Sequence, residues 1–247
     1  MNGAKIRGRR LIPLLVVALS LQMIPLAAAP RVFACSGQLP GRTSHNNVAA
    51  RDGSFVAVGG LNGISSSILE YDPYYSGSNG TGTNATVLLA EPGGGYWAQL
   101  GWFKSKIDGG TIKRETGLEF YGLNSINRYF KWFGSHTVGT STWYEILWES
   151  PNLFHYFIGG TYVWEAADNF LVGLYNIMGE THDLVDQMPG GTTKHVTFVN
   201  NTYFTGNPHT GHWDTGALTT NTTYYDYTPH SGNNGSFGIW DKGCAGA

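Results

Sequence analysis

The chain has little charge, few cysteines and no long helical pattern. Of its 247 residues, 13% are charged and 2 are cysteine. After residue 34, no segment keeps a helical hydrophobic period over three turns, which argues against a helical fold. No Gly-x-Ser-x-Gly sequence is present to place a serine nucleophile on a strand-to-helix elbow. No period of 20–50 residues repeats, so a solenoid or propeller is not indicated.

The first 34 residues have the pattern of a secretory signal peptide. A basic head of Lys5, Arg7, Arg9 and Arg10 precedes an apolar run over residues 11–29, and Val32-Phe33-Ala34 then ends on a small residue. This pattern predicts cleavage and secretion, with no membrane span left after processing. Residues 35–247 are then expected to form one domain, which is long enough to bury a full core.

Loss of the signal segment changes the charge balance. Five of the 15 Lys and Arg residues lie in residues 1–34, which leaves ten against 17 Asp and Glu, a formal −7. A chain without a basic patch is an unlikely nucleic-acid binder, so we expect no such partner. His182-Asp183 and the pair His209 and His212 match no strong metal motif, and we expect neither metal nor cofactor.

The two cysteines, Cys35 and Cys244, stand at the two ends of the processed chain. An even pair in a secreted protein predicts a disulfide that ties the termini together. The competing interpretation is a lipid-modified Cys35 at the cleavage point. Neither position suits a thiol nucleophile.

Short segments rich in aromatic and β-branched residues follow one another, separated mostly by Gly, Asn, Ser or Pro. This pattern predicts an all-β fold, an antiparallel two-sheet β-sandwich of the concanavalin A-like or jelly-roll-like kind. The polar sequence from about residue 205 is expected to be a flexible tail. The expected strands are 54–58, 67–71, 86–90, 96–104, 117–121, 142–148, 153–158, 161–164, 173–178, 181–185 and 195–200.

Two of these strands each carry one lone polar side chain. Because strand side chains alternate between faces, Gln99 shares a face with Trp97, Gly101 and Phe103. Glu180 likewise shares a face with His182, next to Gly179. An amide and a carboxylate on aromatic sheet faces could hold and cut a peptide, or hold a sugar. We expect the two side chains on neighbouring strands of one concave face, kept open by the two glycines.

The order and spacing of these residues resemble the eqolisin glutamic peptidases. The resemblance rests on Gln99-Leu100-Gly101-Trp102-Phe103, then Leu118-Glu119-Phe120-Tyr121, then Gly179-Glu180. The segment from Trp97 to Trp102 is also similar to a strand of the neprosin peptidases. The likeness covers roughly residues 95–190 and implies a concanavalin-like sandwich of two curved sheets.

The resemblance implies an acid-acting endopeptidase with a polypeptide substrate. Glu180 would be the general base that activates water, and Gln99 the donor to the developing oxyanion. The residues expected to contact substrate are Trp97, Trp102, Glu119, Tyr121 and His182.

Two other functions suit the same composition. A non-catalytic, lectin-like sandwich would stack glycans on tryptophans and bond their hydroxyls through Gln99 and Glu180; the tryptophans are Trp97, Trp102, Trp143 and Trp148. A structural cell-envelope protein would use its aromatic residues as core alone. The relative placement of Gln99 and Glu180 distinguishes these alternatives from the peptidase.

Overall fold

Every regular element in the described part of the chain is a β-strand. The computed structural model describes residues 47–52, 60–73, 82–106, 110–122, 129–149, 152–168, 170–181, 188, 190–191, 194–214, 218, 225–231 and 235–242. None of these residues belongs to a helix long and apolar enough to cross a membrane. The signal segment, His182 and both cysteines lie outside the described residues, so the predictions that rest on them stay predictions.

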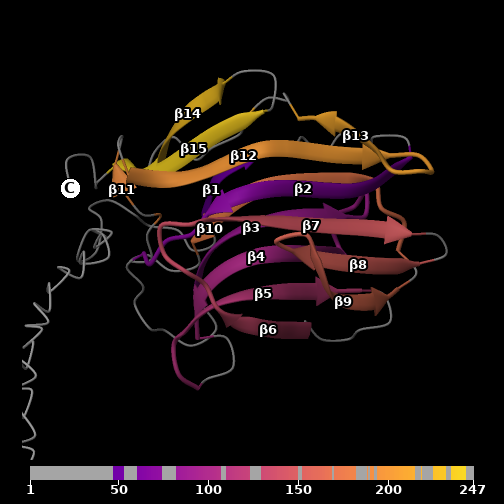
Figure 1. The fold of residues 1–247 in the computed structure, drawn as a ribbon, viewed down its shortest axis with the longest axis horizontal. Helices are drawn as coiled ribbons and strands as arrows, with labels where there is room; N and C mark the ends of the chain where they lie inside the picture. The colour runs from indigo at the N-terminus through magenta and orange to yellow at the C-terminus, as the bar shows by residue number, and fades with distance from the viewer. Residues whose placement is uncertain are drawn as a thin grey trace, which may run out of the picture. The chain divides into compact units, whose positions relative to one another are not determined.

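Six strands form one antiparallel sheet in the order β1-β10-β3-β4-β5-β6 (Figure 1). Alternating apolar and polar residues, with many β-branched and aromatic side chains, favour these pleated segments over helix. The strands are β1 (Asn47–Asp52), β3 (Gly82–Ala90), β4 (Trp97–Ser105), β5 (Lys113–Tyr121), β6 (Tyr129–Ser135) and β10 (Leu174–Thr181).

A nine-stranded antiparallel sheet forms the second layer, with the main order β14-β15-β12-β2-β7-β8-β9. The short strands β11 and β13 both pair with β12. The strands are β2 (Leu61–Leu69), β7 (Ser141–Glu149), β8 (Leu153–Ile158), β9 (Thr161–Ala167), β11 (Gly190–Gly191), β12 (Lys194–Thr205), β13 (Thr210–Trp213), β14 (Tyr225–Ser231) and β15 (Ser236–Asp241). The predicted two-sheet, concanavalin A-like sandwich is confirmed.

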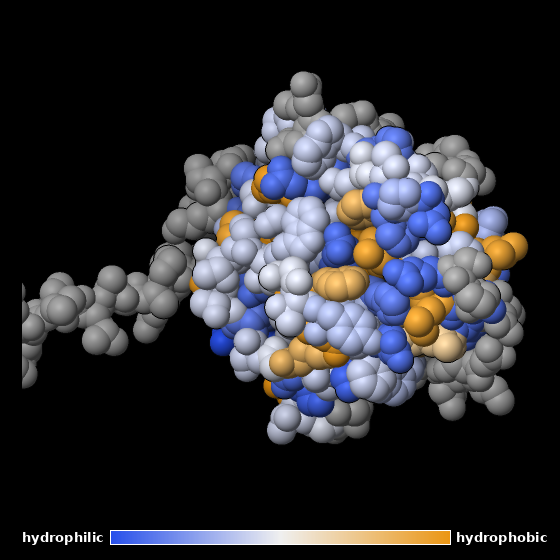
Figure 2. All heavy atoms as spheres, turned by 45° about the vertical axis from the view of Figure 1, so that its right-hand side comes forward, coloured by the Kyte–Doolittle hydropathy of each residue, from blue (hydrophilic) through white to orange (hydrophobic). Residues whose placement is uncertain are grey.

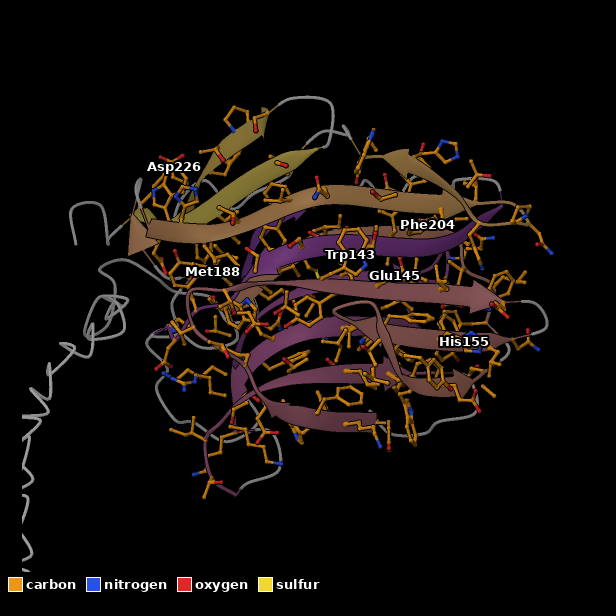
Figure 3. The ribbon with its side chains drawn as sticks, viewed as in Figure 1. Trp143, Glu145, His155, Met188, Phe204 and Asp226 are labelled. Carbon is orange, nitrogen blue, oxygen red and sulfur yellow. The ribbon has the colours of Figure 1, made fainter. Side chains whose placement is uncertain are left out.

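The core lies between the two sheets, where alternate residues of each strand face inward. On β4 the inward residues Leu100 and Trp102 are fully buried, and on β7 Tyr144 and Ile146 face them from the other layer. Trp143 and Glu145, which alternate with these on β7, project from the opposite face (Figure 3). Period-two alternation in the sequence therefore fixed which residues became core.

The C-terminal part of the chain is not the flexible tail that its composition predicted. β13, β14 and β15 all lie after residue 205 and join the nine-stranded sheet. Phe237 and Ile239 of β15 alternate inward and are 3% and 0% exposed. The prediction was wrong because the polar loops masked short strands whose apolar residues complete the core.

Candidate active site

The outer face of the six-stranded sheet, turned away from the nine-stranded sheet, carries a row of polar side chains. Residues directly opposite one another in antiparallel strands share a face. In this sheet Gln99 of β4 lies opposite Glu119 of β5 on one side and Leu88 of β3 on the other. Leu88 in turn lies opposite Asn176 of β10. One transverse row thus places two amides and a carboxylate on the same face.

Gln99 and Glu119 contact each other directly. The Gln99 Nε2 donates a hydrogen bond to Glu119 Oε2, and Thr86 Oγ1 donates to Gln99 Oε1 at 3.3 Å. The two hydrogen bonds fix which end of the amide faces the carboxylate. Gln99 is 3% exposed and Glu119 is 6% exposed. A buried carboxyl group with an amide donor is a preorganised hydrogen-bonded pair rather than a solvated surface group.

Aromatic side chains border this pair at one end. Trp97 lies opposite Tyr121 in the register of β4 and β5, and their ring centroids are 4.9 Å apart. Tyr96 extends the group, with its ring 5.8 Å from that of Tyr121. The β4–β5 hairpin thus gathers four of the predicted site residues: Trp97, Gln99, Glu119 and Tyr121.

Glu180 shares the face with Gln99 but lies away from it. The expectation of neighbouring strands was wrong, because β3 lies between β10 and β4. Glu180 stands in the row of Asn84 and Phe103, four residues along β4 from Gln99. With strands about 4.8 Å apart and residues rising about 3.4 Å each, this offset is too large for both side chains to reach one carbonyl group.

Trp102 cannot contact a ligand on the outer face. Its alternation places it in the core, where it is 0% exposed and its indole N–H donates to the Leu69 carbonyl at 3.2 Å. The sequence pattern already had Trp102 at the opposite parity to Gln99. The prediction of a substrate contact was therefore wrong for this residue.

The two glycines do not keep the outer face open. A Cβ on Gly101 would lie 2.0 Å from the Ala85 carbonyl oxygen of β3, so glycine there permits close approach of two strands. A Cβ on Gly179 would meet Ile239 at 2.3 Å, which shows that Gly179 faces the core. Both glycines serve backbone and core packing.

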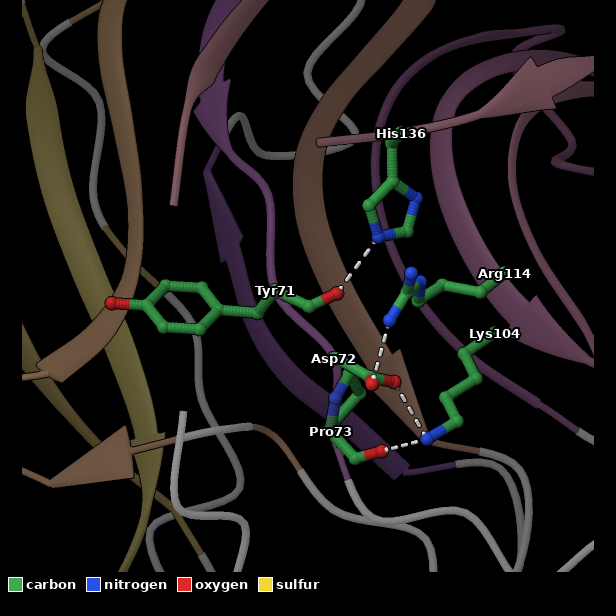
Figure 4. A network of polar contacts seen from close by, with 6 residues as sticks. All are labelled: Tyr71, Asp72, Pro73, Lys104, Arg114 and His136. Atoms are coloured by element: carbon green, nitrogen blue, oxygen red, sulfur yellow. Dashed lines mark hydrogen bonds and ion pairs between the residues drawn. The ribbon is translucent and has the colours of Figure 1, made fainter. Parts of the chain in front are cut away.

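A second polar cluster lies where β2 and β4 end and β5 begins (Figure 4). Asp72 forms ion pairs with Lys104 at 2.7 Å and Arg114 at 2.8 Å, and Lys104 also donates to the Pro73 carbonyl. Burial raises the pKa of Asp72, but hydrogen bonds and attraction from the two cations outweigh it and leave that pKa below its ordinary value. These contacts connect the segment after β2 to β4 and β5.

Beside this cluster, Tyr144 donates to the buried Glu70 carboxylate at 2.6 Å. Burial, and then the Glu70 charge, raise the pKa of Tyr144 well above its ordinary value. His136 approaches the Tyr71 carbonyl through Nε2 at 2.9 Å, and burial lowers its pKa. Sequence reasoning missed this cluster because its members come from strands far apart in the chain.

A metal centre is not formed by the residues that the structure describes, since no three of their His, Cys, Asp and Glu side chains gather closely enough. In the His209 and His212 pair, His212 instead lies 2.9 Å from Thr205 Oγ1 and stacks on Tyr203. The candidate site therefore consists of polar side chains, chiefly the Gln99 amide and the Glu119 carboxyl group.

Comparisons with known proteins extend to the fold. No protein-family model matches the sequence, and the comparison with curated proteins finds no match either. Scytalido-glutamic peptidase with a transition state analog inhibitor is a structural neighbour at a TM-score of 0.51 and 10% identity, over 80% of this chain and 98% of that one. The complex of that peptidase with a peptide-based transition state analog matches at a TM-score of 0.46 and 13% identity, over the same 80% of this chain and 98% of that one.

Porphyranase B from Zobellia galactanivorans matches with a TM-score of 0.36 and 11% identity, over 60% of this chain and 63% of that chain. The match at a TM-score of 0.51 indicates a shared sandwich architecture. It does not extend to a particular family, because one fold hosts many chemistries.

Proposed function

We propose that this protein hydrolyses peptide bonds in acid, with Gln99 and Glu119 as the reacting pair. The observation that supports it is their direct contact on the outer face of a sandwich similar in fold to scytalido-glutamic peptidase. Sequence resemblance gave the same glutamine and a different carboxylate, Glu180. The geometry favours Glu119 because it is the carboxylate within hydrogen-bond reach of the amide.

The chemistry needs one carboxylate and one amide. Glu119 takes a proton from a water molecule, whose oxygen attacks the carbonyl carbon of the scissile bond. The Gln99 amide carries two N–H groups, and one of them donates to the oxygen that becomes negative. The protonated Glu119 then gives its proton to the leaving nitrogen as the C–N bond breaks.

Gln99 and Glu119 are almost completely buried, which restricts access of a substrate. A peptide reaches Gln99 and Glu119 only if the surrounding packing opens, since they are 3% and 6% exposed. Trp97 and Tyr121 then provide an apolar wall for substrate side chains. Peptide binding on this face is therefore coupled to local movement.

The test is digestion of oxidised insulin B chain by the purified protein between pH 2 and 7, with products read by mass spectrometry. We expect cleavage in acid, loss of cleavage in Glu119→Gln, and a fall of about 10²–10³ in turnover for Gln99→Ala. Glu165→Gln, on the exposed strand β9, is the matched carboxylate control and should keep activity.

Glu180→Gln separates the two assignments of the general base. If it abolishes cleavage while Glu119→Gln remains active, Glu180 is the base and the proposed pair is wrong. If folded wild-type protein leaves the peptide intact at every pH, the hydrolase proposal fails. Glycan binding on the outer face would then be the better account.

A further inference from the structure

We propose that a second site, at the end of the sandwich, binds a neutral saccharide. The site is a cleft of about 530 Å³, called here the end cleft. It is formed by the start of β2, the end of β7 and the turn between β12 and β13, at the right-hand end of the molecule in Figure 1. Its lining residues are Gly60, Asn62, Trp148, Glu149, Gly206, Asn207, Pro208 and His209.

Three polar atoms of the lining side chains make no hydrogen bond. They are Asn62 Oδ1, Trp148 Nε1 and His209 Nδ1, all of them buried. Buried polar atoms in folded proteins are nearly always paired, and unpaired ones are costly, so three around one cleft need an explanation. A ligand with hydroxyl groups would supply both the donors and the acceptor that they lack.

The other polar atoms of the same side chains are held in place. Asn62 Nδ2 donates to the Gly206 carbonyl, and the Gly206 N–H donates to the Gly60 carbonyl at 3.1 Å. His209 Nε2 lies 3.9 Å from Glu149 Oε1. These contacts connect the β12–β13 turn to β2 and β7 and so order the cleft walls. Because the three unpaired atoms are themselves buried, a ligand reaches them through a shift of the lining side chains.

The chemistry of the lining favours a sugar over other ligands. Trp148 packs partly against the core and Pro208 adds a second apolar wall, which suits the C–H face of a pyranose ring. The polar atoms around them suit its hydroxyl rim. Among the described lining residues there is no Lys or Arg, whereas Glu149 is one of them, so a phosphorylated or acidic ligand is disfavoured.

The surface at this end agrees with that assignment. Figure 2 turns it forward and shows hydrophobic atoms in small groups separated by hydrophilic ones. His155 lies at the same end, labelled in Figure 3, with its Nδ1 3.6 Å from Glu149 Oε1. Such a mixed surface is less suited to a lipid or a large apolar partner, which would need a contiguous patch.

The site is independent of the peptidase proposal, because its residues belong to the nine-stranded sheet and to the turns next to it. The test titrates the full-length protein with cello-, xylo-, manno-, chito- and laminarihexaose by calorimetry, with saturation-transfer NMR on the best binder. We expect at least one Kd on the order of 1 mM or tighter. Trp148→Phe, which keeps a ring but removes the N–H, and His209→Ala should each weaken it about tenfold.

Two control variants make the outcome decisive. Trp213→Ala removes a tryptophan on β13 that is 53% exposed and does not line the cleft, and it should leave binding unchanged. Gln99→Ala, on the outer face, should also leave it unchanged. The proposal is overturned if no hexaose binds, or if binding survives in both Trp148→Phe and His209→Ala. Loss of binding in Trp213→Ala or Gln99→Ala alone would overturn it as well.

Discussion

The outer face of the six-stranded sheet and the end cleft both carry buried polar side chains. The two regions differ in whether the polar atoms of these side chains have hydrogen-bond partners. On the outer face, the Gln99 amide is engaged at both ends by Glu119 and Thr86. In the end cleft, Trp148 Nε1 and His209 Nδ1 are buried without a hydrogen-bond partner. Hydrogen bonds between buried groups stabilise the fold, whereas unpaired buried groups cost free energy that a ligand can recover by forming the missing hydrogen bonds. The two regions should therefore respond differently to substitution.

The largest effect is expected at Gly101, where the outer face depends on close strand approach. Gly101→Ala would place Cβ 2.0 Å from the Ala85 carbonyl oxygen, and neither backbone can move without breaking the β3–β4 pairing. We expect a loss of about 3 kcal/mol or more in the free energy of unfolding, measured with denaturant. Gly93→Ala is the control, because its added Cβ would lie 3.5 Å from the nearest atom, Glu91 Oε1. It should change the free energy of unfolding little. Equal stability of the two variants would contradict the steric account.

The next effect tests whether the amide–carboxylate pair contributes to stability. Gln99→Ala leaves the buried Glu119 without its amide donor, so we expect a loss of about 1–3 kcal/mol on unfolding. The double replacement of Gln99 and Glu119 by Leu removes the buried carboxyl together with its amide donor and should cost less than Gln99→Ala alone. If the single variant is as stable as the wild type, the pair does not act as a unit and the contrast with the end cleft is lost.

A smaller effect is expected on thermal stability in acid, the pH range of the proposed activity. Burial lowers the pKa of His136 below its ordinary value of 6.5, so the unfolded chain binds this proton more readily. Stability from His136 is therefore lost as the pH falls through 6.5 toward the folded pKa. We expect His136→Gln to flatten the decline in melting temperature between pH 7 and 5.

Asp72 adds to the same decline at lower pH. Its depressed pKa means that its contribution is present above the ordinary value of 3.8 and is lost as the pH falls through the folded pKa. Because Asp72 is partly exposed, solvent screening limits this to at most about 1 kcal/mol. A wild-type melting temperature that rises from pH 7 to pH 3 would contradict the combined effect of the two groups.

The smallest effect is expected in the end cleft. His209→Ala removes a side chain whose Nδ1 has no partner, so the free energy of unfolding should change by about 0.5 kcal/mol or less. The same variant should weaken saccharide binding, as proposed above. A stability loss as large as that of Gln99→Ala, measured in the same denaturant, would show that His209 is structural and would remove the contrast between the regions.

The sequence alone determined where strands form and which face of a strand each side chain occupies. Alternation of apolar and polar residues located strands such as 153–158 exactly and identified an antiparallel sandwich, because side-chain parity on a strand is a local property. The same parity put Gln99 and Trp97 on one face. The pairing of Gln99 with Glu119 was also within reach, since β4 and β5 follow each other in the chain and form a hairpin.

Only the tertiary structure decided which distant strands became neighbours. It inserted β3 between β4 and β10, which separated Gln99 from Glu180 despite a spacing that resembled a known catalytic pair. It also brought Trp148 and His209 to one cleft. Long-range strand order depends on how two whole sheets share their core, and no local pattern encodes that sum of contacts.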